Sequence, residues 1–221
     1  MCGLFGFVHY GSDEIKNLSV LTNSLAKQST VRGMDASGIA YLKNGNIQIQ
    51  KEARSAYYLE LKHHDNIRAL IVHTRNATHG SAEKNYNNHP FFGKAGNTRF
   101  ALAHNGVLWN DRASLHLPKT KIETDSYIAV QLIEQQKKLT FDSIRTMSET
   151  VMGSFSFSIL DDENSLWLVK GDSPLSILHF KEKKIFVYAS TDEILYKAII
   201  DSLLFIDLKR CISLIQDWSL I

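Results

Sequence analysis

The chain lacks the usual features of secreted, membrane and nucleic-acid-binding proteins. Its 221 residues include only two cysteines, Cys2 and Cys211. The sequence starts without the basic and apolar segments of a secretory signal, so we expect a cytoplasmic protein whose thiols stay reduced. No apolar run approaches the roughly 18 residues that a membrane helix needs. The net charge is only +2, and the basic residues are scattered without interleaved aromatics, which argues against a nucleic-acid partner.

Signatures of common cofactor and metal sites are also missing. The sequence contains no phosphate-binding loop and no dinucleotide-binding glycine motif. Its histidines and cysteines lack the spacing of metal ligands, because Cys211 has no nearby partner in the sequence. We therefore expect the chain to need no cofactor and no metal.

The composition is that of a folded domain. Hydrophobic residues make up 44% of the chain and charged residues 22%. A chain of this length can bury one well-formed core, and it shows no linker or low-complexity stretch. We predict a single domain spanning residues 1–221.

Short apolar or alternating runs predict strands, and turn residues join several of them into hairpins. The expected strands are 4–9, 39–42, 47–51, 69–74, 100–104, 154–160, 166–169, 176–180 and 185–189. Antiparallel hairpins with helical segments between them favour an α+β layered domain over a parallel sheet.

Helices are expected where apolar residues recur at steps of three and four, several of them after a typical capping residue. The expected helices begin at Ser12 or Asp13, Ala56, Thr124 or Asp125, Phe141, and Thr191 or Asp192, and end near 25, 61, 136, 151 and 200. Segment 80–96 is rich in Asn, Lys and Gly and predicts a long loop anchored by Phe91 and Phe92.

Cys2 combines two reactive groups once the initiator Met1 is removed. The residue then carries a thiol and a free α-amine. The thiolate is the nucleophilic form of cysteine, and an α-amine titrates near pH 8, so the amine can act as its base. The alternative is that Cys2 is an incidental residue near the terminus.

Five short segments hold residue types that suit this chemistry. They are MCGLFG at 1–6, RGMDASG at 32–38, HTRNATHG at 73–80, HNG at 104–106 and ETD at 123–125. In this order and at this spacing, they resemble the class II glutamine amidotransferases, a family of N-terminal-nucleophile hydrolases. Segments 153–155 and 171–175 extend the resemblance over nearly the whole chain.

The resemblance implies a fold and a reaction. The fold is a four-layer α/β/β/α sandwich with two mainly antiparallel sheets. The reaction is hydrolysis of the L-glutamine side-chain amide through a γ-glutamyl thioester on Cys2, which releases glutamate and ammonia.

The resemblance also assigns catalytic roles. The Asn105 side-chain amide and the Gly106 backbone N–H stabilise the oxyanion, and Arg32 supports the N-terminal residue. Glycine suits this position because no Cβ blocks close approach of a substrate to the backbone. Considered alone, Asn105-Gly106 is typical of a hairpin turn, and segment 33–38 is typical of a tight loop.

Five further residues match the family's substrate-binding positions. Arg75 would bind the α-carboxylate of glutamine, since a guanidinium matches a carboxylate with two parallel hydrogen bonds. Asp125 would accept from the α-ammonium, Thr78 and His79 would assist Arg75, and His89 would lie at the pocket rim. Simpler interpretations stay open: a helix cap for Asp125, a surface ion pair for Arg75, and a loop histidine without function for His89.

Two other histidines, His73 and His104, flank expected strands. We interpret them as core histidines whose hydrogen bonds are satisfied.

Asn76 departs from the family pattern, because it replaces a Trp that helps to close the pocket in glucosamine-6-phosphate synthase. Family enzymes also carry a domain that consumes the ammonia, and residues 1–221 leave no room for one. The chain is then expected to supply a separate ammonia-acceptor synthetase subunit, to act as a free-standing amidohydrolase, or to be a piece of a longer protein. Rival functions are cleavage of another amide and non-catalytic glutamine binding.

Overall fold

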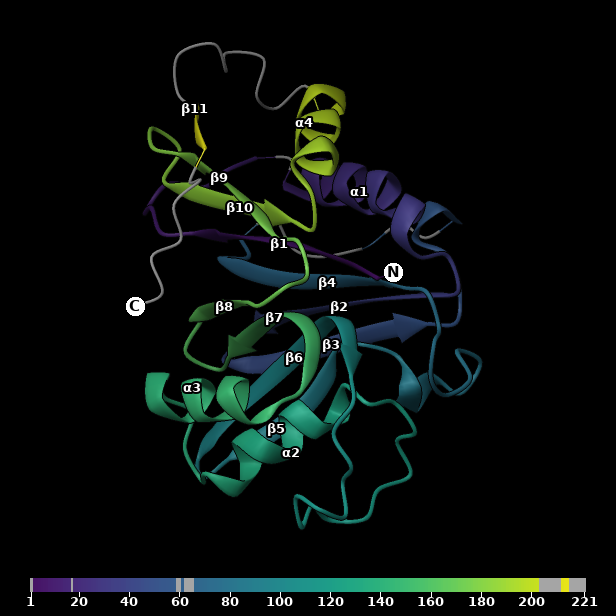
Figure 1. Ribbon diagram of the computed structural model, residues 1–221. Coiled ribbons are helices and arrows are strands. Elements are labelled where there is room, and N and C mark those ends of the chain that lie inside the picture. Colours follow the sequence, from purple (N-terminus) through teal and green to yellow (C-terminus); the bar gives the residue numbers. More distant parts are fainter. Residues whose placement is uncertain (1, 17, 59–60, 62–65, 203–211, 215–221) are drawn as a thin grey trace.

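Two antiparallel sheets lie face to face, and each carries a pair of helices on its outer side (Figure 1). This arrangement is seen in a computed structural model that describes residues 2–16, 18–58, 61, 66–202 and 212–214. The layers are therefore α/β/β/α, as expected. Cys211 lies outside the described residues.

The larger sheet has seven strands in the order β11-β9-β10-β1-β4-β2-β3, all paired antiparallel. Their bounds are β1 Gly3–His9, β2 Ala36–Lys43, β3 Asn46–Glu52, β4 Ala69–Arg75, β9 Ser176–Phe180, β10 Ile185–Ala189 and β11 Ile212–Leu214. The central position of β1 places the start of the chain inside the sheet.

The smaller sheet has the order β5-β6-β7-β8 and is also antiparallel. Its strands are β5 Phe91–Ala95, β6 Thr98–Leu108, β7 Gly153–Asp161 and β8 Leu166–Lys170. Strand β6 continues through the Asn105-Gly106 pair. That pair is therefore strand and not a hairpin turn.

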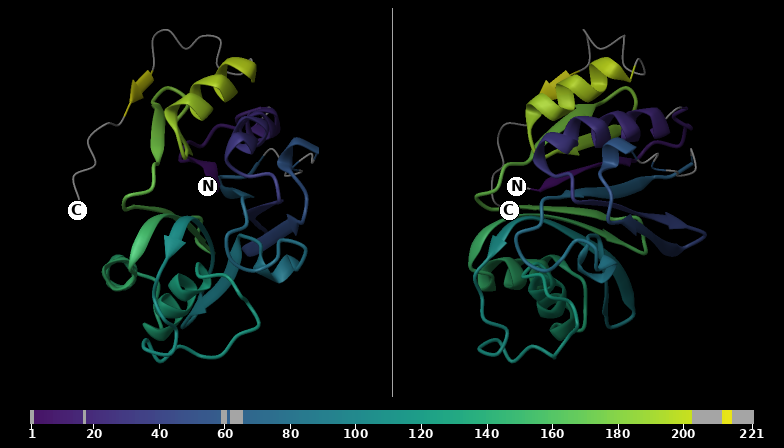
Figure 2. Two further views of the ribbon diagram at one scale, coloured as in Figure 1. Left: turned by 45° about the vertical axis from the view of Figure 1, so that its right-hand side comes forward. Right: turned by 90° about the vertical axis from the view of Figure 1, so that its right-hand side faces the viewer.

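Helices cover the outer face of each sheet (Figures 1 and 2). Helices α1 (Leu18–Ser29) and α4 (Asp192–Asp201) pack on the larger sheet, whereas α2 (Tyr127–Gln135) and α3 (Phe141–Thr150) pack on the smaller one. Three short 3-10 turns, η1 (Thr30–Arg32), η2 (Ala56–Tyr58) and η3 (Asn85–Asn87), lie in the connections.

Three apolar clusters fill the spaces between the layers. Alternation along the strands divides their side chains: Phe5 and Phe7 of β1 face the helices, and Leu4 faces the other sheet. On β6, Ala101 and Ala103 point between the sheets. Small side chains there let the two sheets approach closely, and this brings β6 near the end of β1.

All nine expected strands are present. The hairpin between β2 and β3 turns at Asn44 and Gly45, which both have positive φ values of 52° and 70°. These are the angles that an Asn-Gly hairpin turn requires. The expected Thr191 cap of α4 is also confirmed, since its side chain accepts from the Ile194 N–H.

Three local predictions are wrong. Helix α1 begins at Leu18, so neither Ser12 nor Asp13 caps it, and Ile15 reaches the core from outside the helix. The short helix expected over 56–61 is a 3-10 turn, η2, in the described residues 56–58; residues 59–60 lie outside the described part, so its full length stays a prediction.

The other two errors concern segment 80–96 and α2. The segment is not one long loop, because it contains η3 and β5, and Phe92 is 49% exposed, so only Phe91 anchors it. Helix α2 begins at Tyr127 without a side-chain cap, so neither Thr124 nor Asp125 caps it. The described residues include no helix long and apolar enough to span a bilayer.

Candidate active site

Cys2 stands directly before β1, beside the end of β4. Gly3 pairs with Thr74, so the next residue of β4, Arg75, lies next to Cys2. Ala36 at the start of β2 pairs with Arg75 from the other side. The sheet register thus gathers three of the five sequence segments at one end of the neighbouring strands β1, β4 and β2 (Figure 1).

The Cys2 thiol is held by the backbone of Asn76. The Asn76 N–H donates to the sulfur at 3.5 Å, and the thiol faces the Asn76 carbonyl oxygen at 3.6 Å. Arg32 Nε donates to the Cys2 carbonyl oxygen at 2.8 Å, so Arg32 does contact the N-terminal residue. Burial raises the pKa of the thiol, although the Asn76 hydrogen bond and the Arg75 charge oppose this effect. The thiol is therefore protonated at neutral pH and needs a base to become a nucleophile.

Segment 32–38 packs against the peptide that touches Cys2. A Cβ on Gly33 would lie 2.4 Å from the Arg75 carbonyl carbon and 2.7 Å from Asn76 N. Asp35 adds two hydrogen bonds: its N–H donates to the Arg75 carbonyl at 2.9 Å, and its carboxylate accepts from the Ala77 N–H at 2.7 Å. The RGMDASG segment is thus more than a tight loop, because it fixes the backbone around the thiol.

Arg75 is buried, and within the described part of the chain its guanidinium bonds only neutral groups. Nη1 donates to Asn88 Oδ1 at 2.7 Å, and Nη2 donates to the His79 and Gly80 carbonyls at 2.5 and 2.9 Å. None of the ion pairs among the described residues involves Arg75, so the surface ion pair is wrong. A buried cation without a bonded carboxylate is a favourable place for an anionic ligand group.

Asp125 lies in the connection between β6 and α2. Its Oδ2 accepts from the Leu108 N–H at 2.6 Å, which ties the carboxylate to the end of β6. Its charge acts on Arg75, since it opposes the burial that lowers the pKa of the guanidinium. Arg75 and Asp125 thus place opposite charges beside the same thiol.

The Asn105-Gly106 pair lies on β6 of the facing sheet. Asn105 is 2% exposed, and its Nδ2 has no hydrogen-bond partner among the described residues. Gly106 has a φ of +144°, and a Cβ there would lie 1.9 Å from the Ser154 carbonyl oxygen. Only glycine fits this position. The buried amide therefore carries a donor that the described part of the chain does not use.

Three histidines of this region, His73, His89 and His104, are buried. The rings of His73 and His89 lie with their centroids 4.1 Å apart and their planes tilted by 33°. Burial lowers the pKa of His73 to about 3 and that of His104 to about 4, and it also lowers the pKa of His89. All three are therefore neutral at pH 7, and none serves as a charged acid there.

Their hydrogen bonds differ. His104 Nδ1 pairs with Ser126 Oγ at 2.7 Å, and His73 Nε2 pairs with the His104 carbonyl oxygen at 2.9 Å. His73 Nδ1 and both nitrogens of His89 have no partner among the described groups. The expectation of satisfied core histidines is therefore right for His104 and wrong for His73. His89 is only 3% exposed, so it is a buried wall residue and not a rim residue.

One small cavity brings most of the expected site residues together. Its lining consists of Cys2, Arg75, Asn76, Thr78, His79, His89, His104, Gly106, Thr124, Asp125 and Ser126. Arg32 contacts Cys2 from outside this lining, and Asn105 is not part of it. The cavity volume of about 10 Å³ is close to the minimum for one water molecule. A larger ligand therefore requires the wall to open.

Comparison with known proteins identifies the family. Residues 1–156 match the family model of the class II glutamine amidotransferases. The chain belongs to this family. It is 32% identical over 188 residues to a glutamine–fructose-6-phosphate aminotransferase of Bacillus licheniformis and 34% identical over 189 residues to one of Bacillus thuringiensis. Each alignment covers 80% of this chain and 30% of the relative, so the chain spans under a third of these proteins.

Solved structures show the same fold. The chain resembles the glutamine phosphoribosylpyrophosphate amidotransferase of B. subtilis with a TM-score of 0.65 and 21% identity. A structure described as the allosteric regulatory enzyme of purine biosynthesis gives a TM-score of 0.70 at 21% identity. Both matches cover 89% of this chain and 43% of the other. The α+β sandwich is therefore that of the class II amidotransferase glutaminase fold.

Several residues that shape this amidotransferase site were missed in the sequence. Asp35 lies within the 32–38 segment, and this position could have indicated a role near Cys2. Asn88, which orients Arg75, and Lys51, which contacts Asn88, carried no signal because both contacts span distant parts of the chain.

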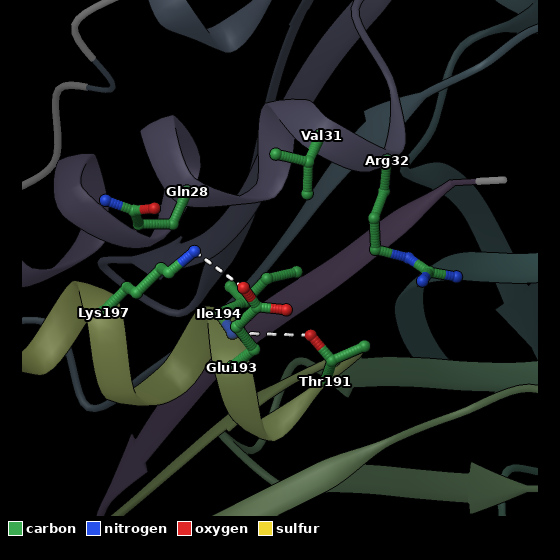
Figure 3. A pocket seen from close by; sticks show the side chains of 7 residues that line it. All are labelled: Gln28, Val31, Arg32, Thr191, Glu193, Ile194 and Lys197. Atoms are coloured by element: carbon green, nitrogen blue, oxygen red, sulfur yellow. Dashed lines mark hydrogen bonds and ion pairs between the residues drawn. The ribbon is translucent and has the colours of Figure 1, made fainter.

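A wider groove of about 400 Å³ lies between the end of α1 and the start of α4 (Figure 3). Gln28, Val31 and Arg32 line one side, and Thr191, Glu193, Ile194 and Lys197 line the other. Glu193 and Lys197 form an ion pair at 2.6 Å across one helical turn. The lining contains no cysteine or histidine, so we place the chemistry in the smaller cavity. Clusters of three or more His, Cys, Asp or Glu side chains that could hold a metal are not found within the described ranges.

Proposed function

We propose that this class II amidotransferase domain hydrolyses the side-chain amide of L-glutamine. The observation that carries the proposal is the convergence of Cys2, Arg75, Gly106 and Asp125 on one cavity, from four separate segments of the chain. Together they supply a nucleophile, a backbone donor and two opposite charges. Glutamine needs each of these, since it presents an amide carbonyl, an α-carboxylate and an α-ammonium.

Substrate recognition follows from charge. Arg75 binds the α-carboxylate, because no carboxylate of the described residues is bonded to its buried guanidinium, and Asp125 accepts from the α-ammonium. Thr78, His79 and His89 complete the walls. Since burial keeps His89 neutral, it contributes packing and hydrogen bonding to the ligand. An amide that lacks an amino-acid head group would leave both charges unpaired.

The chemistry begins at Cys2 after loss of Met1. The α-amine takes the thiol proton, and the sulfur attacks the amide carbon to form a tetrahedral oxyanion. The Asn105 amide and the Gly106 N–H donate to that oxygen, while Arg32 holds the Cys2 carbonyl. The protonated α-amine of Cys2 then returns the proton to the leaving nitrogen, the C–N bond breaks and ammonia departs. Water hydrolyses the thioester, which releases glutamate and restores the thiol.

The closed cavity implies a step before chemistry. Its volume of about 10 Å³ holds no amino acid, so Asn76, Thr78 and His79 on the segment after β4 have to move for glutamine to bind. The side chain of Asn76 is exposed, and it covers less of the ligand than the family Trp would. We expect looser closure over glutamine in consequence.

The ammonia acceptor lies outside residues 1–221 in this proposal. The Bacillus relatives are named aminotransferases that act on fructose 6-phosphate, and they are more than three times as long as the matched region. We propose that this domain supplies ammonia to an acceptor, either fused or a separate synthetase subunit. The reduced cytoplasm suits the free Cys2 thiol. One domain over 1–221 and independence from cofactors stay predictions.

Glutamate release from glutamine tests the function. The purified wild-type chain should hydrolyse glutamine, Cys2→Ala should fall to background, and Cys211→Ala should keep full activity as the matched cysteine control. Undiminished release by Cys2→Ala would contradict the proposal. Intact-protein mass spectrometry should show loss of Met1 in active enzyme, and activity with Met1 retained would rule out the α-amine as base.

A further inference from the structure

Lys51 of β3 is a half-buried lysine close to Arg75, and the reaction above gives it no role. Its Nζ donates to the Asn88 carbonyl oxygen at 2.7 Å and to the Pro90 carbonyl oxygen at 3.3 Å. It also lies 5.2 Å from the centre of the Phe91 ring. The ion pairs found between described residues do not include it. This ammonium therefore bonds backbone carbonyls where a surface lysine would meet water.

The 88–90 turn packs closely on β2 beside Lys51. A Cβ on Gly38 of β2 would lie 2.2 Å from the His89 carbonyl oxygen and 2.8 Å from the Lys51 Cβ. Gly38 and Lys51 are opposite each other in the β2–β3 register. The turn thus rests on a glycine and is held from the neighbouring strand by the lysine, so its backbone is fixed from two directions.

Asn88 connects the 88–90 turn to Arg75. Its Nδ2 donates to the Ala82 carbonyl at 2.7 Å and to Asn85 Oδ1 at 3.2 Å. These two acceptors set the orientation of the amide, and Oδ1 then faces Arg75 Nη1 at 2.7 Å. With 1% of its surface exposed, Asn88 has little room for another rotamer. Any shift of its backbone would move the acceptor that aims the guanidinium.

The charges agree with this interpretation. Burial, aided by the Arg75 charge, lowers the pKa of Lys51 to about 8. The titratable groups facing Lys51 are Arg75 and the neutral His89, while Asn88, Pro90, Phe91 and Gly38 contribute groups that do not titrate. Two neighbouring cations without a bonded carboxylate are unfavourable in an empty site, and an anionic ligand group relieves that repulsion.

We propose that Lys51 is a positioning residue of the carboxylate site: its ammonium fixes the 88–90 turn, so that Asn88 holds the Arg75 guanidinium ready for an α-carboxylate. The identity of the ligand rests on the proposed glutamine hydrolysis. Lys51 touches neither the substrate nor Cys2, so its loss acts on ligand binding and leaves the chemical step intact.

Steady-state kinetics on the full chain test the proposal. Lys51→Met removes the donors and the charge but keeps the stem, and Lys43→Met is the matched control on an exposed lysine of β2. We expect the KM for glutamine to rise about tenfold in Lys51→Met with kcat within twofold, and no change in Lys43→Met. An unchanged KM, or an equal loss in kcat, would overturn the proposal.

The conservative variant Lys51→Arg separates charge from packing. It keeps a cation at all accessible pH values, so it should bind glutamine within about threefold of wild type at pH 7. Between pH 7 and 9 the wild-type KM should rise more steeply than that of Lys51→Arg, because only Lys51 loses its proton. Groups such as the substrate α-ammonium titrate in both proteins and cancel in the comparison. Identical pH profiles of KM in the two proteins would refute the positioning role. The comparison uses only Lys51→Arg, which keeps the positive charge.

A third measurement does not depend on activity. In Lys51→Met the side-chain amide protons of Asn88 should exchange with solvent at least tenfold faster by NMR, whereas Lys43→Met should match wild type. Should the wild-type chain fail to hydrolyse glutamine, the proposed function falls while faster exchange still supports Lys51 as the residue that orders Asn88. Unchanged exchange contradicts the inference whether or not the enzyme is active.

Discussion

Replacement of Asn105 by leucine should separate the catalytic role of this residue from its structural role. The side chain is 2% exposed, and its Nδ2 has no hydrogen-bond partner among the described residues. A buried donor without a partner costs about 1–3 kcal/mol of folding free energy. Leucine has a similar shape and no polar atom, so Asn105→Leu removes that cost together with the oxyanion donor.

The two effects have opposite signs. Relief of an unpaired donor should raise the free energy of unfolding by about 1 kcal/mol or more, which corresponds to roughly 2–4 °C in Tm for a chain of this size. Loss of one oxyanion donor should raise the activation barrier by about 3–4 kcal/mol, so kcat falls roughly 10²- to 10³-fold. We therefore expect a more stable and nearly inactive protein.

Asn110→Leu provides the matched control. Asn110 Nδ2 donates to the Thr150 carbonyl at 3.1 Å, and its Oδ1 accepts from the Met152 N–H at 2.6 Å. The same substitution there breaks two hydrogen bonds. It should lower the free energy of unfolding by about 1 kcal/mol, which lowers Tm by a few degrees, and leave kcat unchanged. Thermal unfolding and glutaminase kinetics on both variants give the comparison.

The reasoning would be refuted by either of two results. If Asn105→Leu keeps more than a tenth of the wild-type kcat, Asn105 is not an oxyanion donor. If the variant loses stability as Asn110→Leu does, the Nδ2 donor is paired in the folded protein and is not held for the substrate.

Three further predictions concern other parts of the site. Gly106→Ala should destabilise the fold by about 2–4 kcal/mol in urea unfolding, because the new Cβ would lie 1.9 Å from the Ser154 carbonyl oxygen; a stability equal to wild type would contradict the observed backbone. Arg75→Lys should raise the KM for glutamine about 100-fold, since an ammonium cannot form the two parallel bonds, yet it should not weaken binding of 4-aminobutanamide, which lacks the α-carboxylate. An equal loss with both ligands would assign Arg75 a purely structural role. The pKa values of His73 and His104, about 3 and 4 in the fold, lie below the ordinary 6.5, so the unfolded chain binds protons that the native state does not. The free energy of unfolding should therefore fall by about 1.4 kcal/mol per pH unit for each histidine as the pH drops from 6.5 towards 4, and equal urea midpoints at pH 7 and pH 5 would contradict this.

Local patterns predicted most of the elements and missed those set by distant contacts. The β2–β3 hairpin follows from Asn44-Gly45, because neighbouring residues alone decide that turn. Strand β5 was missed because its own composition does not indicate a strand; its extended backbone is stabilised by pairing with β6. Likewise, Asp125 does not cap α2, which starts at Tyr127; its carboxylate accepts from the Leu108 N–H of β6, a contact that no local pattern indicates.

The sequence by itself determined the chemistry available to this protein. Cys2, Arg75, Asn105, Gly106 and Asp125 are residue types that suit amide hydrolysis, and their order in the chain identifies the family without any coordinates. Such motifs can be recognised in the sequence because each consists of a few neighbouring residues.

Only the tertiary structure decided how these groups meet. The pairing of β1 with β4 sets Arg75 beside the thiol, and the close packing of the two sheets brings Gly106 to the same cavity. The support from Lys51 through Asn88 joins residues 37 positions apart and has no local signature. Such contacts depend on register and on the distance between layers, and both are fixed only when the whole core packs.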